Sequence, residues 1–266
     1  MLPRLFHVGG VGVATHDVFV VLGVVAAALV FAREARRRRV RDPRIWTIVA
    51  GALLTGAVFA KLGMGWRYLA ETPEPSLVGL WLYGGKSVLG GLAGAYFGAL
   101  GTKRLVGYRE KTGDLFAPAV ALGVAVGRIG CFLTEQVGTP TSLPWGISVS
   151  STVAKGIPMC DGCAPGVPMH PSFLYEIAFL LGLFGVLLWL RPRVRVPGEL
   201  FKIFLLAYGV FRFFVEFVRG NETFAWGLSG SQVFLLFTLP LLFAYFVRQL
   251  TRHAYRAEPA LAAAGG

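Results

Sequence analysis

Charged residues are scarce in this chain of 266 residues: they make up 15% of it, whereas soluble domains carry about 25%. Acidic residues are the scarcest of them, with 14 Asp and Glu against 26 Lys and Arg. Cysteine is rare as well, and 3 cysteines are too few for a small disulfide-stabilised fold. The shortage of charge also excludes a disordered chain and an ordinary cytosolic enzyme, because both need more polar surface.

Hydrophobic residues fill most of the remaining sequence. They make up 55% of it, with 21 Phe and 35 Gly, and the mean hydropathy is +0.63. A transmembrane helix needs about 20 mostly apolar residues, and seven stretches meet this condition, near 16–32, 45–62, 79–101, 115–134, 171–190, 199–218 and 231–250. The sequence therefore predicts an all-α integral membrane protein with seven transmembrane helices. We expect residues 1–256 to form a single polytopic membrane domain and residues 257–266 to be a disordered tail.

Basic residues are concentrated in alternate connections between the predicted spans. The segments after the first, third and fifth spans, together with the C-terminal tail, hold most of the Lys and Arg residues. Cytoplasmic loops carry such an excess, so the pattern predicts an external N-terminus and a cytoplasmic C-terminus. The arginine-rich run at 33–44 is then a topology anchor on anionic lipid rather than a nucleic-acid site, and we expect no nucleic-acid partner.

The longest external segment, near 135–170, contains the CxxC pair Cys160 and Cys163. An oxidising exterior favours a local disulfide between them. A metal site would need two further ligands, and only His170 lies near in the sequence. A redox role would need a thioredoxin-like βαβ pattern, which this sequence lacks. The disulfide is therefore the favoured interpretation.

Polar residues interrupt the apolar stretches in four places, where a central charge costs at least about 2.5–3.5 kcal/mol. Each place has an ordinary structural explanation: a snorkelling lysine, an Arg–Glu pair, a helix start or an i,i+4 pair. In the predicted topology, however, the last three groups lie near the same outer face. Arg128 and Arg212 can converge there on a bidentate anion, such as the phosphate of a lipid headgroup. The four groups are Gly84–Gly91 with Lys86; Arg128 with Glu135 and Gly138; His170, Ser172, Tyr175 and Glu176; and Arg212 with Glu216.

Three motifs, in this order, resemble those of the prolipoprotein diacylglyceryl transferase family: GRIGCFLTEQVGTPTSLPWGISV, HPSFLYE and YGVFRFFVEFVRG. The resemblance covers nearly the whole chain. It implies a multi-pass enzyme of the bacterial inner membrane that moves a diacylglyceryl group from phosphatidylglycerol to the lipobox cysteine of a prelipoprotein. The implied partners are phosphatidylglycerol, the prelipoprotein signal peptide and membrane lipids, and no metal or organic cofactor is implied.

The resemblance also assigns roles to individual residues. It implies catalytic roles for Arg128, Glu135 and Arg212, with the two arginines holding the phosphate of the lipid donor. The implied substrate-binding residues are Gly90, Gly91, Gly138, His170, Ser172, Tyr175, Glu176 and Glu216.

The chain differs from the family pattern at Leu89, Cys131 and His16, which stand where the family carries His, Asn and Tyr. Leu89 cannot accept a proton, so His16 becomes the candidate general base, with His170 as its rival, because histidine exchanges protons near neutral pH. Cys131 lies within an apolar span and is not expected to be a nucleophile. The alternative function is a catalytically altered paralogue that binds phospholipid or a lipidated partner. A transporter would need an inverted repeat, which we do not find in the sequence.

Overall fold

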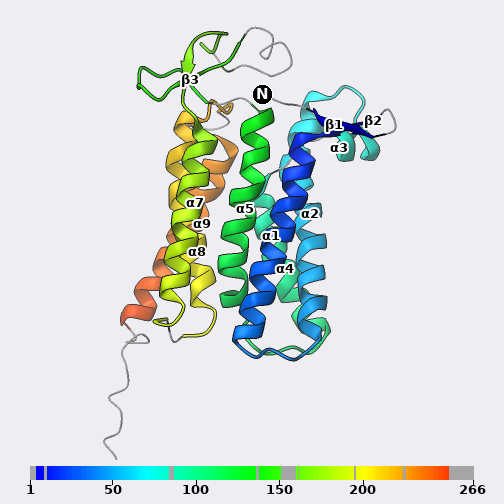
Figure 1. Ribbon diagram of the computed structural model, residues 1–266, viewed down its shortest axis with the longest axis vertical. Helices are drawn as coiled ribbons and strands as arrows, with labels where there is room; N and C mark the ends of the chain where they lie inside the picture. Colours follow the sequence, from blue (N-terminus) through cyan, green and yellow to red (C-terminus); the bar gives the residue numbers. More distant parts are fainter. Residues whose placement is uncertain are drawn as a thin grey trace, which may run out of the picture. The chain divides into compact units, whose positions relative to one another are not determined.

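A computed structural model describes residues 4–8, 11–83, 87–135, 138–150, 160, 162–194, 196–223 and 226–251 (Figure 1). The described chain is helical apart from short strand pairs, as the sequence predicts. The predicted tail at 257–266 and Lys86 lie outside these residues. The elements, in chain order, are β1 (Arg4–Val8), β2 (Val11–Ala14), α1 (Thr15–Arg37), α2 (Arg44–Glu71), α3 (Leu77–Tyr83), α4 (Val88–Leu105), α5 (Gly113–Thr134), β3 (Ile147–Ser148), β4 (Pro168–Met169), α7 (Ser172–Leu190), α8 (Glu199–Val215), the 3₁₀ turn η1 (Glu216–Val218) and α9 (Gly230–Thr251).

Five of the described helices are long and apolar enough to cross a membrane: α1, α2 over residues 44–63, α5, α7 and α9. The protein is therefore an integral membrane protein with a helical core. Within the predicted stretch 79–101, α3 ends at Tyr83 and α4 begins at Val88, and Ser87 ahead of α4 has extended backbone geometry. The Ser87 hydroxyl accepts a hydrogen bond from the backbone N–H of Gly90 at 3.0 Å, so it caps the start of α4.

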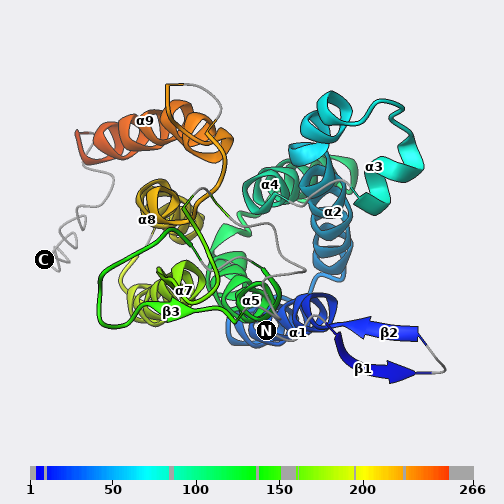
Figure 2. The same cartoon turned by 90° about the horizontal axis from the view of Figure 1, so that it is seen from above.

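The chain divides into two compact units, and the first comprises residues 1–38 and 111–266. In this unit α5 packs on α1, α7 and α8, and α9 packs on α8 (Figure 2). Glycines allow α1 and α5 to approach closely: a Cβ on Gly23 would lie 2.5 Å from the carbonyl oxygen of Gly123. Small residues at such contacts are the usual means of packing helices in a membrane.

The second unit, residues 39–110, contains α2, α3 and α4, with α2 packed along α4. At one end of this pair Arg44 donates hydrogen bonds to the Asp42 carboxylate, the shortest at 2.6 Å, and to the carbonyl oxygen of Val106 at 3.1 Å. The hydrogen bonds from Arg44 lower the pKa of Asp42. Arg44 thereby ties the start of α2 to the end of α4.

Buried acidic residues mark one end of the first unit, where α1 ends and α5 and α8 begin. Glu34 pairs with Arg37 at 2.9 Å and with Arg191. Asp114 pairs with Arg38 at 3.3 Å. Part of the arginine-rich run therefore binds buried carboxylates, which holds the helix ends together.

The external segment that the sequence predicts near 135–170 contains β3 and β4, which pair in antiparallel fashion. Cys160 and Cys163 form a disulfide, as the sequence favours. The Cys163 sulfur lies 3.4 Å from the carbonyl oxygen of Gly138. The disulfide thus lies against the segment that follows α5.

Candidate functional site

A cluster of buried charges lies at the end of the first unit where α5 and α8 end and α7 begins. From α5 comes Arg128, which is 5% exposed. Its Nε lies 2.9 Å from Oε1 of Glu176 on α7, and its guanidinium lies 5.7 Å from the centre of the Phe173 ring. An Arg128–Glu135 pair is one interpretation that the sequence left open, but the carboxylate that Arg128 contacts among the described residues belongs to Glu176.

Glu176 is fully buried and joins three elements. Its Oε1 accepts a hydrogen bond of 2.6 Å from the hydroxyl of Tyr208 on α8. Its Oε2 accepts one of 3.3 Å from Nη1 of Arg219, which follows η1.

Glu216 is the second buried carboxylate of the cluster and accepts from several donors. Arg212 donates to it across one turn, as the i,i+4 spacing predicts. Asn221 donates to Glu216 at 2.7 Å and Ser229 at 2.8 Å, so residues beyond α8 close over the carboxylate. Arg219 lies 3.8 Å from the same group.

The cluster therefore holds the three guanidinium groups of Arg128, Arg212 and Arg219 against the two carboxylates of Glu176 and Glu216. The Nε atoms of the three arginines are buried and have no hydrogen bond with acceptable geometry among the described residues. The Arg128 Nε and Glu176 therefore attract each other as an ion pair, without a well-aligned hydrogen bond. A buried excess of one positive charge with unused donors is suited to binding an anion.

Backbone hydrogen bonds tie the segments after α5, before α7 and after α8 to one another. The N–H of Thr139 donates to the carbonyl oxygen of Val218 at 3.0 Å, and the N–H of His170 donates to that of Thr139 at 2.8 Å. Gly138 lies between the two flanking segments, since a Cβ there would come within 2.4 Å of the His170 oxygen and 2.5 Å of the Val218 oxygen. The three motifs therefore meet at Gly138.

His170, Ser172 and Tyr175 lie beside this junction. Nδ1 of His170 lies 3.2 Å from the Tyr175 hydroxyl, which also accepts a hydrogen bond of 2.8 Å from the indole N–H of Trp145. Ser172 is 1% exposed, and its backbone N–H donates to the His170 carbonyl oxygen at 2.8 Å. These contacts hold the HPSFLYE segment against the loop that follows α5.

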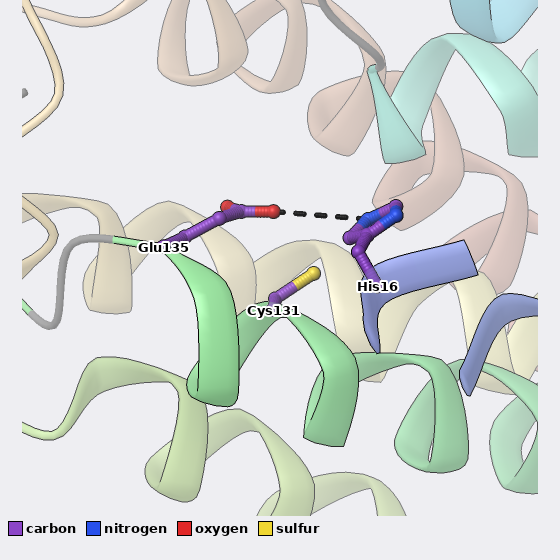
Figure 3. A group of neighbouring side chains, drawn as sticks. All are labelled: His16, Cys131 and Glu135. Carbon is purple, nitrogen blue, oxygen red and sulfur yellow. Dashed lines mark ion pairs between the residues drawn. The ribbon is translucent and has the colours of Figure 1, made fainter. Parts of the chain in front are cut away.

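His16 and Glu135 form a second group, where α1 begins and α5 ends (Figure 3). Nε2 of His16 lies 3.8 Å from Oε1 of Glu135. Cys131 lies between them, 7% exposed, and accepts a hydrogen bond of 3.6 Å from Nη1 of Arg128. Arg128 thus connects this group to the buried cluster.

Gly90 and Gly91 belong to α4 in the second unit. A Cβ on Gly90 would lie 2.6 Å from the carbonyl oxygen of Phe59 on α2, whereas a Cβ on Gly91 would make an ordinary contact of 3.4 Å with Ala60. Gly90 thus allows α2 and α4 to approach closely. Its contact with Phe59 is a helix-packing contact within the second unit.

The sequence patterns assigned no site role to three residues that contact the buried glutamates: Tyr208, Arg219 and Ser229. Tyr208 and Arg219 carried a usable signal, because Tyr208, Arg212, Glu216 and Arg219 follow one another at helical spacings of four, four and three. Ser229 carried none, because its contact with Glu216 depends on how the chain returns after η1.

Comparison with known proteins identifies relatives along almost the whole chain. Residues 3–248 match the family described as prolipoprotein diacylglyceryl transferase. A phosphatidylglycerol–prolipoprotein diacylglyceryl transferase of Dehalococcoides mccartyi is 30% identical over 92% of this chain and 92% of its own length. The protein of the same name from Bordetella bronchiseptica is 31% identical over 86% and 88%, and that from Finegoldia magna 29% over 86% and 88%.

Proposed function

The chain belongs to the prolipoprotein diacylglyceryl transferase family, and we propose that it carries out the family's reaction at the buried arginine cluster. It transfers the diacylglyceryl group of phosphatidylglycerol to a prolipoprotein, as its relatives are named for doing. The single observation that carries the assignment of the site is the excess of guanidinium groups over carboxylates where the three motifs meet.

The reaction is a displacement at a glycerol carbon. The thiol sulfur of the prelipoprotein cysteine forms a bond to this carbon while the carbon–oxygen bond to the phosphate breaks. Glycerol phosphate leaves, and the thiol proton must pass to an acceptor. The enzyme therefore has to stabilise charge on the departing phosphate and assist loss of the thiol proton.

Arg128 and Arg212 are the proposed phosphate ligands. A planar guanidinium donates two parallel hydrogen bonds to phosphate oxygens, which a lysine cannot do. Their positions, both 5% exposed and fixed by buried glutamates, preorganise them before the lipid arrives. Arg219 adds the third positive charge.

Glu176 and Glu216 hold the guanidinium groups in place rather than take part in bond making. Each contacts two arginines of the cluster. Gly138, Ser172 and Tyr175 are proposed to shape the lipid-binding end, because Gly138 lies where the three motif segments meet. That Gly90 and Gly91 bind substrate stays a prediction from the family resemblance.

His16 is the proposed acceptor of the thiol proton, and Glu135 is proposed to orient it. The support is the 3.8 Å separation of the His16 ring and the Glu135 carboxylate. His170 is the rival acceptor, but its Nδ1 is already engaged with Tyr175 at 3.2 Å.

In the membrane we propose seven spans, with the N-terminus outside and the C-terminus in the cytoplasm of a bacterial inner membrane. The distribution of Lys and Arg supports this orientation. It places the arginine cluster at the outer face, where α5 and α8 end and α7 begins. That residues 1–256 act as one membrane domain stays a prediction.

Complementation tests the function. Expression of the chain should rescue a bacterial strain depleted of its own diacylglyceryl transferase, and the prelipoprotein should gain the mass of one diacylglyceryl group. Failure to rescue, with the protein correctly inserted in the membrane, would favour the alternative of a paralogue that only binds phospholipid or a lipidated partner.

A further inference from the structure

His16, Cys131 and Glu135 bring three different metal-binding side chains together beside the arginine cluster (Figure 3). One ring nitrogen, one sulfur and one carboxylate oxygen lie within 4.8 Å of one another. We propose that these three side chains bind a Zn²⁺ ion.

The donor set favours zinc among the common divalent cations. Zn²⁺ accepts imidazole, thiolate and carboxylate ligands, whereas Ca²⁺ and Mg²⁺ prefer oxygen ligands alone. Zinc sites with three protein ligands keep a fourth position open and are typical of catalytic sites. The described residues supply three ligands, so the site is of this open kind.

The distances fit after a small adjustment of the side chains. Zinc lies about 2.0–2.3 Å from nitrogen, oxygen and sulfur ligands, so tetrahedral neighbours are about 3.3–3.8 Å apart. His16 Nε2 and Glu135 Oε1 are already 3.8 Å apart, and the widest separation in the group is within 4.8 Å. Side-chain rotations that close the group by about 1 Å complete the geometry.

The backbone holds the three residues close together before any metal binds. Cys131 and Glu135 are four residues apart, and the N–H of Glu135 donates to the Cys131 carbonyl oxygen at 2.7 Å. Gly130 brings α1 against α5, since a Cβ there would lie 3.2 Å from the Cα of His16. Little backbone freedom is therefore lost on binding, which favours affinity.

The surroundings of the ligands also suit a metal. Oδ1 of Asp17 lies 3.3 Å from Nδ1 of His16, and metal-bound histidines usually have such a carboxylate on their second nitrogen. Nη1 of Arg128 lies 3.6 Å from the Cys131 sulfur and donates to it, which fixes the position of that sulfur. The charge of Arg128 is itself paired with Glu176 at 2.9 Å, which limits its repulsion of the ion.

The open position deepens the proposed function, and this part of the inference rests on that function. A zinc-bound thiol loses its proton to water far more readily than a free thiol. The metal would then activate the substrate thiol beside Arg128 and replace the general base that Leu89 cannot provide. Nε2 of His16 cannot accept a proton and bind zinc at once, so these two roles exclude each other.

Metal loading of the full chain tests the site. The protein is purified in detergent without a polyhistidine tag, stripped with a chelator, loaded with Zn²⁺ or Co²⁺ and desalted. We expect about one metal ion per chain, in line with one three-ligand site, and near-ultraviolet sulfur-to-cobalt charge-transfer absorption for the Co²⁺ form. Zinc X-ray absorption should show one sulfur ligand at about 2.3 Å. No retained metal, or a shell without sulfur, overturns the proposal.

Variants locate the metal. Cys131→Ser should abolish the sulfur-to-cobalt band, and His16→Gln and Glu135→Gln should lower affinity by more than the roughly 10–100-fold expected for Asp17→Asn. His170→Gln is the matched control and should retain full metal binding. Retention of metal by both Cys131→Ser and His16→Gln overturns the site. If a variant does not fold, the cobalt and X-ray absorption of the unmodified chain show whether a sulfur ligand binds the metal.

Transfer assays on the same preparations keep the two claims apart. Zinc bound through these residues, with no diacylglyceryl transfer under any condition, would confirm the site while the proposed function failed. Full transfer by the metal-free protein, lost in His16→Gln, would overturn the metal's part in the reaction and return His16 to the role of base.

Discussion

Replacement of Gly138 by alanine should separate the three motif segments that surround the arginine cluster. The new Cβ would lie 2.4 Å from the carbonyl oxygen of His170 and 2.5 Å from that of Val218. Both neighbours are backbone atoms, so neither can rotate away as a side chain would. The strain must be relieved by moving one segment away from the other.

The cost follows from the contacts that would be disturbed. Overpacking of a tight site costs about 1–3 kcal/mol. The displaced segments also carry the hydrogen bonds from Thr139 to Val218 and from His170 to Thr139, each worth about 0.5–1.5 kcal/mol. We therefore expect Gly138→Ala to lose about 2–6 kcal/mol of stability and most of its transferase activity.

Thermal unfolding in detergent and a phosphatidylglycerol-dependent transfer assay measure the two effects. Gly182→Ala is the matched control, because Gly182 lies on α7 and a Cβ there meets nothing within 4 Å. The control should be as stable and as active as the unmodified chain. If Gly138→Ala behaves like Gly182→Ala in both assays, the junction at Gly138 does not position the cluster.

Three other substitutions or measurements test the neighbouring residues. Glu176→Gln should destabilise the protein by about 3–5 kcal/mol, because it leaves buried arginines such as Arg128 without their carboxylate; an unchanged unfolding midpoint would contradict this. His16→Gln should lose most of the rate, because it removes the side chain proposed to act on the substrate thiol; an unchanged rate in His16→Gln would exclude His16 from thiol activation. Cys131 should carry no covalent lipid when the purified protein is analysed by mass spectrometry, and a diacylglyceryl adduct there would make it a nucleophile.

The sequence was sufficient to find most of the charged residues of the cluster and the Arg212–Glu216 pair, but not the other partners. Arg128, Glu176 and Arg212 stand out because a charge within an apolar stretch is costly. That Arg128 contacts Glu176, and that Glu135 lies near His16, depends on how α1, α5 and α7 pack, which local spacing does not encode. Arg219 directly follows the sixth predicted stretch, 199–218, so the predicted topology places it in an external loop, yet its side chain is 10% exposed.

The helical class could be predicted from hydropathy, whereas the residue at which a helix begins within the third predicted stretch could not. Residues 79–101 are apolar enough to count as one span, and hydropathy does not register where a helix within that stretch begins. The cap that Ser87 provides marks the start of α4. A serine ahead of a glycine-rich segment is a usable signal for the start of a helix. In a hydropathy profile, however, the apolar residues on either side of Ser87 outweigh it.

The claim that two buried arginines hold the phosphate of phosphatidylglycerol is tested most directly by measuring diacylglyceryl transfer in proteoliposomes. The comparison is between the unmodified chain, Arg128→Ala, Arg212→Ala, the two corresponding lysine variants and Arg248→Ala, which removes an exposed arginine from the last turn of α9. The account predicts that transfer is abolished in both cluster alanine variants, poorly restored by lysine, and unchanged in Arg248→Ala. Full transfer by either Arg128→Ala or Arg212→Ala, inserted at normal levels, would contradict it.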